Sequence, residues 1–294
     1  MQGNTMRHVR RIYQATSQHW VGDGFLVQPL FSHMGEDKQT DPFLMLDYAA
    51  PMEFAPNTAH PHGVGQHPHK GFETVTIAYH GEVAHRDSTG GGGVIKEGDV
   101  QWMTAGAGII HEEFHSEAFS QRGGLFEMVQ LWVNLPAKDK NTPARYQHLA
   151  KENIPVVTLP NEAGYIRVIA GAYEDARGRA HSFTEMNVWD IVLHANAAAS
   201  LQLPEHHNLS MVVLRGDVTF NGTQTAHAGE LVGFVTEAGT IELQAGSEEV
   251  KILLLSGVPI DEPVVGYGPF VMNTQQEIRQ AINDFNAGRF GAIE

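Results

Sequence analysis

Hydrophobic and polar residues alternate along most of this chain in short runs that are typical of β-strands. Residues 72–79 are rich in β-branched side chains and have no helical period, and residues 100–104 alternate in the same way. Glycine and aspartate turns separate these runs, as at Gly81 and at Gly98-Asp99. The repeated order of strand and turn predicts an all-β sandwich or barrel.

The second half of the chain repeats the turn pattern of the first half. Residues 229–239 resemble residues 98–106, and residues 216–218 resemble residues 81–83. Such self-similarity indicates a duplicated β-domain. A polar stretch rich in lysine and aspartate separates the two halves, so we expect domains at residues 1–138 and 161–294, joined by a linker at residues 139–160.

The chain closes with the pattern of one short helix. Thr274 and Glu277 have the spacing of a capping box, and Ile278, Ile282 and Phe285 recur at helical intervals before a glycine. One short C-terminal helix leaves the all-β class unchanged.

Composition narrows the chemistry. The 294 residues include no cysteine, which excludes disulfides and thiolate catalysis and restricts metal ligands to histidine, carboxylates and backbone oxygens. We find no apolar run of membrane-spanning length and no pattern of a secretory leader. We therefore expect a cytoplasmic protein with no membrane partner.

The charge balance disfavours direct binding to nucleic acid. Nineteen lysines and arginines face 34 acidic residues, for a formal net charge of −15, whereas phosphate backbones reward clustered positive charge. Arg7, Arg10 and Arg11 form the densest basic group. We expect them to be solvated arginines on an amphipathic first strand.

Histidines concentrate in one segment, where eight of the 17 lie between His60 and His115. Side chains at positions i and i+2 of a strand share a face, so His67 shares a face with His69, and His111 shares one with Glu113. If the two strands are neighbours, three imidazoles and one carboxylate converge. That donor set suits a first-row divalent metal with open positions for a substrate or dioxygen.

Several neighbouring residues compete with this assignment. Glu73 has the parity of His67 and His69, and His115 has the parity of His111, so spacing alone does not select the fourth ligand. His60 and His62 lie in a proline-rich loop, where we expect an exposed pair. His206 and His207 are adjacent, so we expect opposite orientations and no metal site in the second copy.

Longer motifs carry a resemblance to a known family. His67-x-His69 with Glu73 and Gly81 resembles the first cupin motif, and residues 98–111 resemble the second, with Thr104 where cupins usually have proline. The closer likeness is to the pirin family within the cupins. It is carried by blocks at residues 67–75, 98–106, 108–113, 131–135, 262–265 and 268–274.

The resemblance implies two tandem cupin domains, each a jelly-roll β-barrel. It implies Fe2+, or another divalent first-row metal, in the N-terminal barrel only, with ligands at His67, His69, His111 and Glu113. The family does not count the position of Glu73 as a ligand, so we expect Glu73 to lie beside the ligands.

The resemblance also implies an activity. Pirins are similar in their site to quercetin 2,3-dioxygenases, so we expect an iron-dependent dioxygenase acting on quercetin or a related flavonol. Glu113, or as second choice Glu73, would be its general base. The alternative is a non-enzymatic, metal-dependent regulatory protein that binds a transcription factor or a metabolic enzyme. A relict cupin without metal is a third reading.

Overall fold

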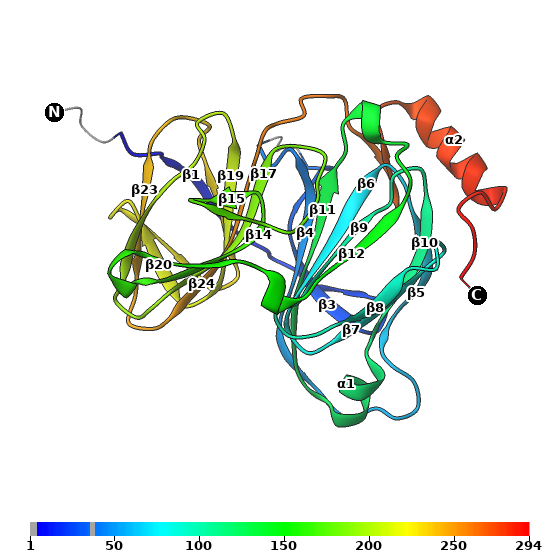
Figure 1. Ribbon diagram of the computed structural model, residues 1–294, viewed down its shortest axis with the longest axis horizontal. Helices are drawn as coiled ribbons and strands as arrows, with labels where there is room; N and C mark the ends of the chain where they lie inside the picture. Colours follow the sequence, from blue (N-terminus) through cyan, green and yellow to red (C-terminus); the bar gives the residue numbers. More distant parts are fainter. Residues whose placement is uncertain (1–4, 36–38, 294) are drawn as a thin grey trace. The chain divides into compact units, whose positions relative to one another are not determined.

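The computed structural model describes residues 5–35 and 39–293, which form two compact units (Figure 1). Among the described residues, the leading unit comprises residues 16–35, 42–151 and 260–293, and the trailing unit comprises residues 5–15, 39–41 and 152–259. The outer limits of the predicted domains, at residues 1 and 294, lie outside the described residues.

The leading unit contains two antiparallel sheets. Seven strands form the larger sheet, in the order β12 (Arg145–Leu149), β9 (Val100–Thr104), β6 (Phe72–His80), β11 (Gly124–Asn134), β4 (Phe43–Phe54), β3 (Phe25–Ser32) and β2 (His19–Val21). Four strands form the smaller sheet, in the order β5 (Gly63–His69), β10 (Ile109–His115), β7 (Val83–Asp87) and β8 (Gly92–Ile95). A hairpin of β25 (Val265–Tyr267) and β26 (Phe270–Met272) belongs to the same unit.

The trailing unit repeats this arrangement. Its seven-stranded sheet runs β1 (Val9–Gln14), β22 (Glu230–Phe234), β19 (Asn208–Arg215), β24 (Val250–Gly257), β17 (Met186–Leu193), β14 (Gly164–Ala170) and β13 (Val156–Thr158). Its four-stranded sheet runs β18 (Ala198–Gln202), β23 (Thr240–Ala245), β20 (Asp217–Phe220) and β21 (Gln224–His227). A short pair, β15 (Ala172–Tyr173) and β16 (Ala176–Arg177), accompanies them. The two-domain, all-β cupin architecture is therefore confirmed.

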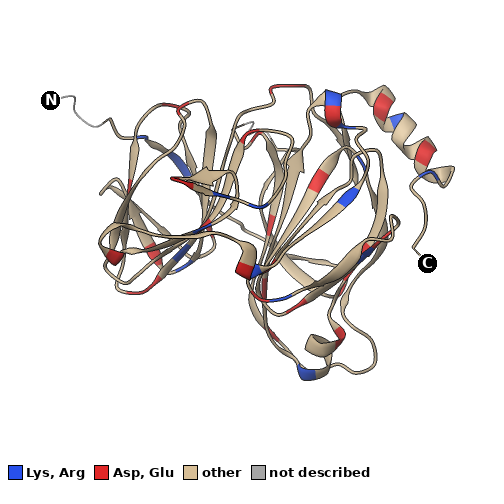
Figure 2. Cartoon of the chain, in the orientation of Figure 1, with Lys and Arg blue, Asp and Glu red and all other residues tan. Residues whose placement is uncertain are grey.

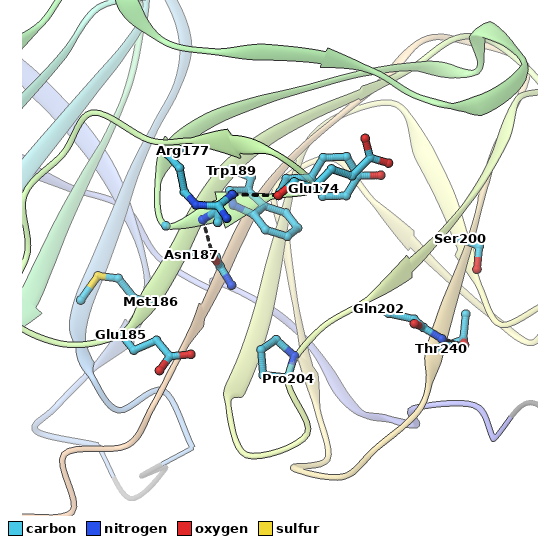
Figure 3. A pocket seen from close by; sticks show the side chains of 13 residues that line it. Glu174, Arg177, Glu185, Met186, Asn187, Trp189, Ser200, Gln202, Pro204 and Thr240 are labelled. Carbon is cyan, nitrogen blue, oxygen red and sulfur yellow. Dashed lines mark hydrogen bonds between the residues drawn. The ribbon is translucent and has the colours of Figure 1, made fainter.

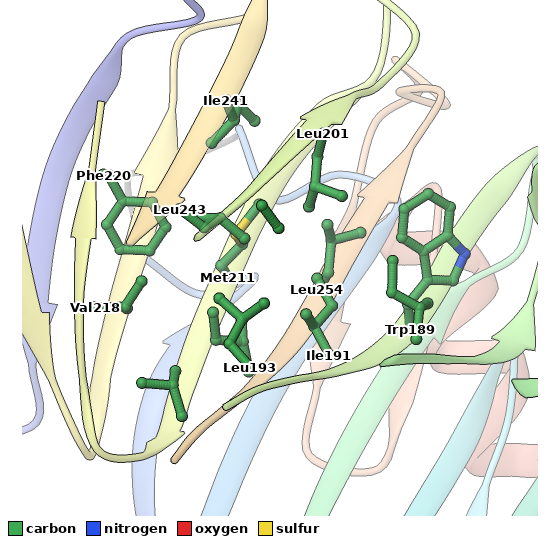
Figure 4. Packing of buried hydrophobic residues seen from close by; sticks show 14 of the residues in the cluster. Trp189, Ile191, Leu193, Leu201, Met211, Val218, Phe220, Ile241, Leu243 and Leu254 are labelled. Carbon is green, nitrogen blue, oxygen red and sulfur yellow. The ribbon is translucent and has the colours of Figure 1, made fainter. Parts of the chain in front are cut away.

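The core of the trailing unit shows why these sequences form two layers. In β23 and β18, buried and exposed residues alternate, so one face of the smaller sheet is apolar. Leu201 and Leu243 from that face pack in one cluster with Met211 and Leu254 of the larger sheet (Figure 4). The clustered side chains exclude water between the two sheets.

The units draw on both ends of the chain. Strand β1, expected in the N-terminal domain, pairs with β22 of the trailing unit, whereas residues 260–294 belong to the leading unit. The expected linker at residues 139–160 contains two strands: β12 pairs with β9, and β13 pairs with β14. Both strands lie at sheet edges, where a polar sequence is compatible with pairing.

Two α-helices and three short 3-10 helices occur in the described residues. The predicted C-terminal helix is α2 (Gln275–Asn286), and the hydroxyl of Thr274 accepts a hydrogen bond from the Glu277 amide at 3.2 Å. Helix α1 (Glu117–Arg122), which the pattern did not predict, is capped by Ser116. The 3-10 helices are η1 (Ala137–Asp139), η2 (Lys151–Asn153) and η3 (Pro160–Glu162).

The predicted basic group is only partly exposed. Arg7 is fully buried in the trailing unit, where its guanidinium donates to the carbonyls of Val235 at 2.9 Å and His207 at 2.5 Å. The expectation of a solvated Arg7 is wrong, because its side chain reaches into that unit and donates to backbone carbonyls there, while the neighbouring His8 is exposed. Basic and acidic positions intermingle along the chain (Figure 2).

None of the described helices is long and apolar enough to cross a bilayer.

A buried lysine in the leading unit fixes the turn that follows β5. Lys140 is 1% exposed and donates to the carbonyl oxygens of Gly71 at 2.8 Å and Val271 at 3.0 Å, and to Oδ1 of Asn134 at 2.8 Å. Burial lowers the pKa of Lys140 to about 8, although Glu262 and Glu277 oppose the shift. The ammonium group thus stays charged at neutral pH and holds β26 against this turn.

Replacing Lys140 is expected to destabilise the leading unit. Lys140→Met leaves three acceptors without their donor, which should lower the free energy of unfolding by about 3 kcal/mol. Urea unfolding at pH 7 measures the change, and Lys138→Met, at a side chain that is 79% exposed, is the control. Equal stability of the two variants would contradict this role for Lys140.

Candidate metal centre

Two neighbouring strands of the leading unit carry the predicted ligands. Strands β5 and β10 pair in antiparallel register, with His67 opposite His111 and His69 opposite Ile109. Strand β5 lies at the edge of its sheet, where Pro68 breaks no ladder. The pairing brings the imidazoles of two distant sequence segments to one place.

The three imidazoles form a compact trio. Ring centroids lie 4.3 Å apart for His67 and His111, and 4.9 Å apart both for His67 and His69 and for His69 and His111. One ring nitrogen of each lies within 4.8 Å of those of the other two. His69 and His111 are buried, and His67 is partly exposed. A single cation could therefore contact all three rings.

The protonation states of the two buried rings suit metal binding. Burial, reinforced by neighbouring imidazoles, holds the pKa of His69 and of His111 well below the usual range, so both rings are neutral at pH 7. Nδ1 of His69 and Nε2 of His111 are buried without a hydrogen-bond partner among the described residues. Nδ1 of His67 lies 2.8 Å from the carbonyl of Gly65, which leaves its Nε2 for a ligand. Buried nitrogens without partners are costly, and a bound cation would satisfy them.

Glu113 lies next to the trio. A carboxylate oxygen of Glu113 lies within 4.8 Å of a ring nitrogen of His111. The side-chain amide of Gln101 donates to its Oε1, and that of Gln130 donates to its Oε2 at 3.1 Å. The hydroxyl of Thr76 lies 3.1 Å from Oε1. These donors hold the carboxylate in one orientation beside His111.

Glu73 faces away from the trio, so the expectation that it shares their face is wrong. Strand β5 ends at His69 and β6 begins at Phe72, with Gly71 between them at φ 92°. The side chain of Thr76 in β6 reaches Glu113, so it lies on the face turned toward the trio. Glu73 is three residues from Thr76 in the same strand, and its side chain therefore lies on the opposite face. The break at Gly71 thus interrupts the alternation of faces that began in β5.

The carboxyl group of Glu73 is buried, and among the described residues only one of its two oxygens has a hydrogen-bond partner. Its Oε1 accepts a hydrogen bond from Thr104 at 2.7 Å, and its Oε2 has no partner among the described residues. Burial raises the pKa of Glu73 to about 7, against the opposing effect of Thr104. At neutral pH the carboxyl group of Glu73 is thus close to the midpoint of its titration, and we assign it a structural role.

Sequence reasoning missed His85 and Asp87, which support His111. Nδ1 of His85 lies 3.3 Å from Nδ1 of His111, and Nε2 of His85 lies 3.0 Å from Oδ2 of Asp87. Burial would raise the pKa of Asp87, but hydrogen bonds from His85 and Thr89 outweigh it and lower the pKa to about 2. The i, i+2 spacing of His85 and Asp87 was the available signal.

The other candidate histidines lie outside the trio. Nδ1 of His62 contacts Asp23 at 2.8 Å, and the ring of His60 is largely exposed. His115 donates from Nε2 to the carbonyl of Gly24 at 2.9 Å and packs among phenylalanines of the core. His115 is therefore a hydrogen-bonded core residue.

A small cavity of about 240 Å³ opens beside the trio. Most of its walls are apolar, and polar groups are few. The lining residues are Val21, Phe25, Val27, Met45, Asp47, Val64, His67, His69, Glu113, Met128, Gln130, Trp132 and Pro269. Such a site suits a flat, mostly apolar ligand that brings one polar group to the imidazoles.

The trailing unit has a different cavity, of about 760 Å³, with Trp189, Asn187 and Arg177 in its walls (Figure 3). At its edge Glu185 lies close to His206 and His207, which the spacing did not predict. Both nitrogens of His207 already have protein partners, Ser256 at 2.8 Å and Glu185 at 3.2 Å. This group therefore lacks the unpartnered nitrogens of the leading trio.

Family models match the chain twice. A model described as Pirin matches residues 24–133, and a model described as Pirin C-terminal cupin domain matches residues 188–291. A Pseudomonas aeruginosa protein, whose name gives quercetin 2,3-dioxygenase as a provisional activity, is 51% identical over 97% of this chain and 99% of the relative. A pirin-like protein of Solanum lycopersicum is 36% identical over 92% of this chain and 88% of the relative.

Solved structures agree with this likeness. A crystal structure described as quercetin 2,3-dioxygenase from Acinetobacter baumannii is 52% identical, with a TM-score of 0.94, and the match covers 98% of this chain and 100% of that one. An Escherichia coli pirin in complex with nickel(II) is 19% identical, with a TM-score of 0.63, and the match covers 85% and 100% of the two chains. At that identity the likeness supports the fold alone.

Removing two imidazoles of the trio is expected to abolish metal binding. Loss of an outer partner of a metal ligand costs about 10- to 100-fold in affinity, so the double variant His67→Ala, His69→Ala should lose on the order of 100-fold or more. Anaerobic calorimetry with Fe(II), and metal analysis after dialysis, measure the loss. The double variant His60→Ala, His62→Ala, at two histidines outside the trio, is the control, and an unchanged affinity of the trio variant would refute the site.

Glu73→Gln is expected to change how stability depends on pH. The folded state raises the pKa of Glu73 from 4.5 to about 7, so the native protein binds one more proton than the unfolded chain between these values. Wild-type stability should fall relative to the variant by about 3 kcal/mol as the pH rises through this window. Urea unfolding at pH 4.5 and 7.5 measures the difference, and a constant gap would contradict it.

Proposed function

The chain belongs to the pirin family, and we propose that it is a metal-dependent dioxygenase acting on a flavonol or a related enolisable aromatic molecule. The proposal is carried by three clustered imidazoles that lie beside an apolar cavity, two of them with an unpartnered buried nitrogen. The names of the bacterial relatives supply the substrate class.

We propose His67, His69, His111 and Glu113 as the ligands of Fe2+ or another divalent first-row metal. Nitrogen donors with a single carboxylate, and coordination positions left open, are typical of non-haem iron oxygenases. When bound, the metal would supply Lewis acidity and a place for dioxygen and substrate to meet. Gln101 and Gln130 would keep the carboxyl group of Glu113 turned toward His111.

The cavity walls would orient the substrate. Trp132 lies edge-on to His69, with ring centroids 5.3 Å apart, and both residues line the cavity. Phe25, Met45 and Met128 complete a wall that a planar aromatic ring could cover while water is excluded. The substrate would then present its hydroxyl and carbonyl oxygens to the imidazoles.

The predicted base roles fit this geometry poorly. Both oxygens of Glu113 already accept hydrogen bonds from side-chain amides, and one of them would also bind the metal, so this carboxyl group is poorly placed to accept the substrate proton. Glu73 is absent from the cavity lining and faces the opposite side of β6. Another group is therefore needed to accept the substrate proton.

Oxygen consumption tests the activity. Protein loaded with Fe(II) and mixed with quercetin should take up oxygen, whereas the double variant His67→Ala, His69→Ala should not exceed the rate of the buffer. The His60→Ala, His62→Ala protein should retain the wild-type rate, because both side chains lie outside the trio: His60 is exposed, and the half-buried His62 contacts Asp23. Wild-type uptake no faster than that of the trio variant would contradict the dioxygenase, and would leave metal-dependent binding of a partner protein as the alternative.

A further inference from the structure

One ionisable group in the cavity has no role in the site described above. Asp47 lies in β4, is 7% exposed and lines the cavity together with His67, His69 and Glu113. Among the described residues, none forms a hydrogen bond with its side chain. An ionised carboxylate against apolar walls loses solvation, so a donor that enters the cavity would gain from meeting it.

The strand register fixes the direction of Asp47. Asp47 lies directly opposite Gln130 in the antiparallel pair of β4 and β11, and residues directly opposite each other project from the same face of a sheet. The side chain of Gln130 reaches Glu113, so that face is the one turned toward the trio. The carboxyl of Asp47 therefore enters the cavity from the large sheet, whereas the imidazoles enter it from the small one.

We propose that Asp47 is the general base that accepts the proton of the 3-hydroxyl of a flavonol-like substrate in this cavity, an inference that rests on the proposed function. The O–H bond of the substrate breaks, the proton moves to a carboxylate oxygen of Asp47, and the electron pair stays on the substrate oxygen. Asp47 becomes neutral, and the substrate becomes an anion that faces the imidazoles.

The electrostatic setting suits this task. Burial raises the pKa of Asp47, and His19 opposes the shift. The other titratable groups that line the cavity around it are His67, His69 and Glu113. A carboxylate with a raised pKa is a stronger base than an exposed one, and among the described residues no side-chain amide donates to Asp47, whereas two donate to Glu113.

The test uses 3-hydroxyflavone, whose anion absorbs at longer wavelength than its neutral form. Wild-type, Asp47→Asn and Glu53→Gln proteins are loaded with Fe(II), checked for equal metal content and titrated without oxygen. Glu53 is an exposed acid on the same strand, so its variant removes a charge outside the cavity. Because all three proteins keep the metal, a spectral difference reports on the acid at position 47.

We expect bound anion in the wild type and in Glu53→Gln, and bound neutral flavonol in Asp47→Asn at pH 7. With oxygen, turnover of Asp47→Asn should fall by about 10²- to 10⁴-fold. It should recover as the pH rises above the pKa of the free hydroxyl, because the substrate then arrives already ionised. If thermal unfolding shows that Asp47→Asn does not fold, Asp47→Ser replaces it.

The outcomes separate the two proposals. Wild-type spectra and rates in Asp47→Asn would overturn the role of Asp47 and leave the dioxygenase standing. Bound anion that requires Asp47, without oxygen uptake by any protein, would support the base and overturn the dioxygenase. Failure of 3-hydroxyflavone to bind the wild type would overturn both.

Discussion

The site depends on the antiparallel pairing of β5 with β10. This register places His67 opposite His111, and the three imidazoles then crowd within 4.9 Å of one another, centre to centre. Such crowding is tolerable only because the buried rings are neutral, and their unpartnered nitrogens remain a cost that a cation would relieve. A shift of β5 by one residue would turn its histidines to the other face of the sheet.

The surroundings of the trio differ from one side to another: polar side chains contact Glu113 and His111, whereas the cavity walls are mostly apolar. Gln101 and Gln130 donate hydrogen bonds to Glu113 and hold its carboxyl group in one orientation. Next to His111, the pair His85 and Asp87 contacts the ring, and neither residue lines the cavity. The cavity itself is mostly apolar, with Asp47 as the carboxyl that lacks such donors. One site can thus combine an oriented carboxyl group with a second one that accepts a proton, because their surroundings differ.

The two units share an architecture and differ in chemistry. Each has a seven-stranded and a four-stranded sheet, yet the trio lies in the leading unit. The trailing unit also gathers a glutamate and two histidines, but His207 is satisfied by Ser256 and Glu185. A duplicated fold therefore supplies the same scaffold twice, and the chemistry follows from which side chains are left without partners.

The sequence by itself determined the features that depend only on residues close together in the chain. Alternation of faces within one strand paired His67 with His69, and His111 with Glu113, and the capping box at Thr274 located the helix. The tertiary structure decided what depends on contacts between distant segments. It placed the side chain of Glu73 on the face opposite to that of the trio, because Gly71 interrupts the strand. It also paired the polar linker segment as edge strands and turned the side chain of Asp47 toward the cavity. A strand's two-residue period is local, but strand pairing and sheet partners depend on packing across the whole unit.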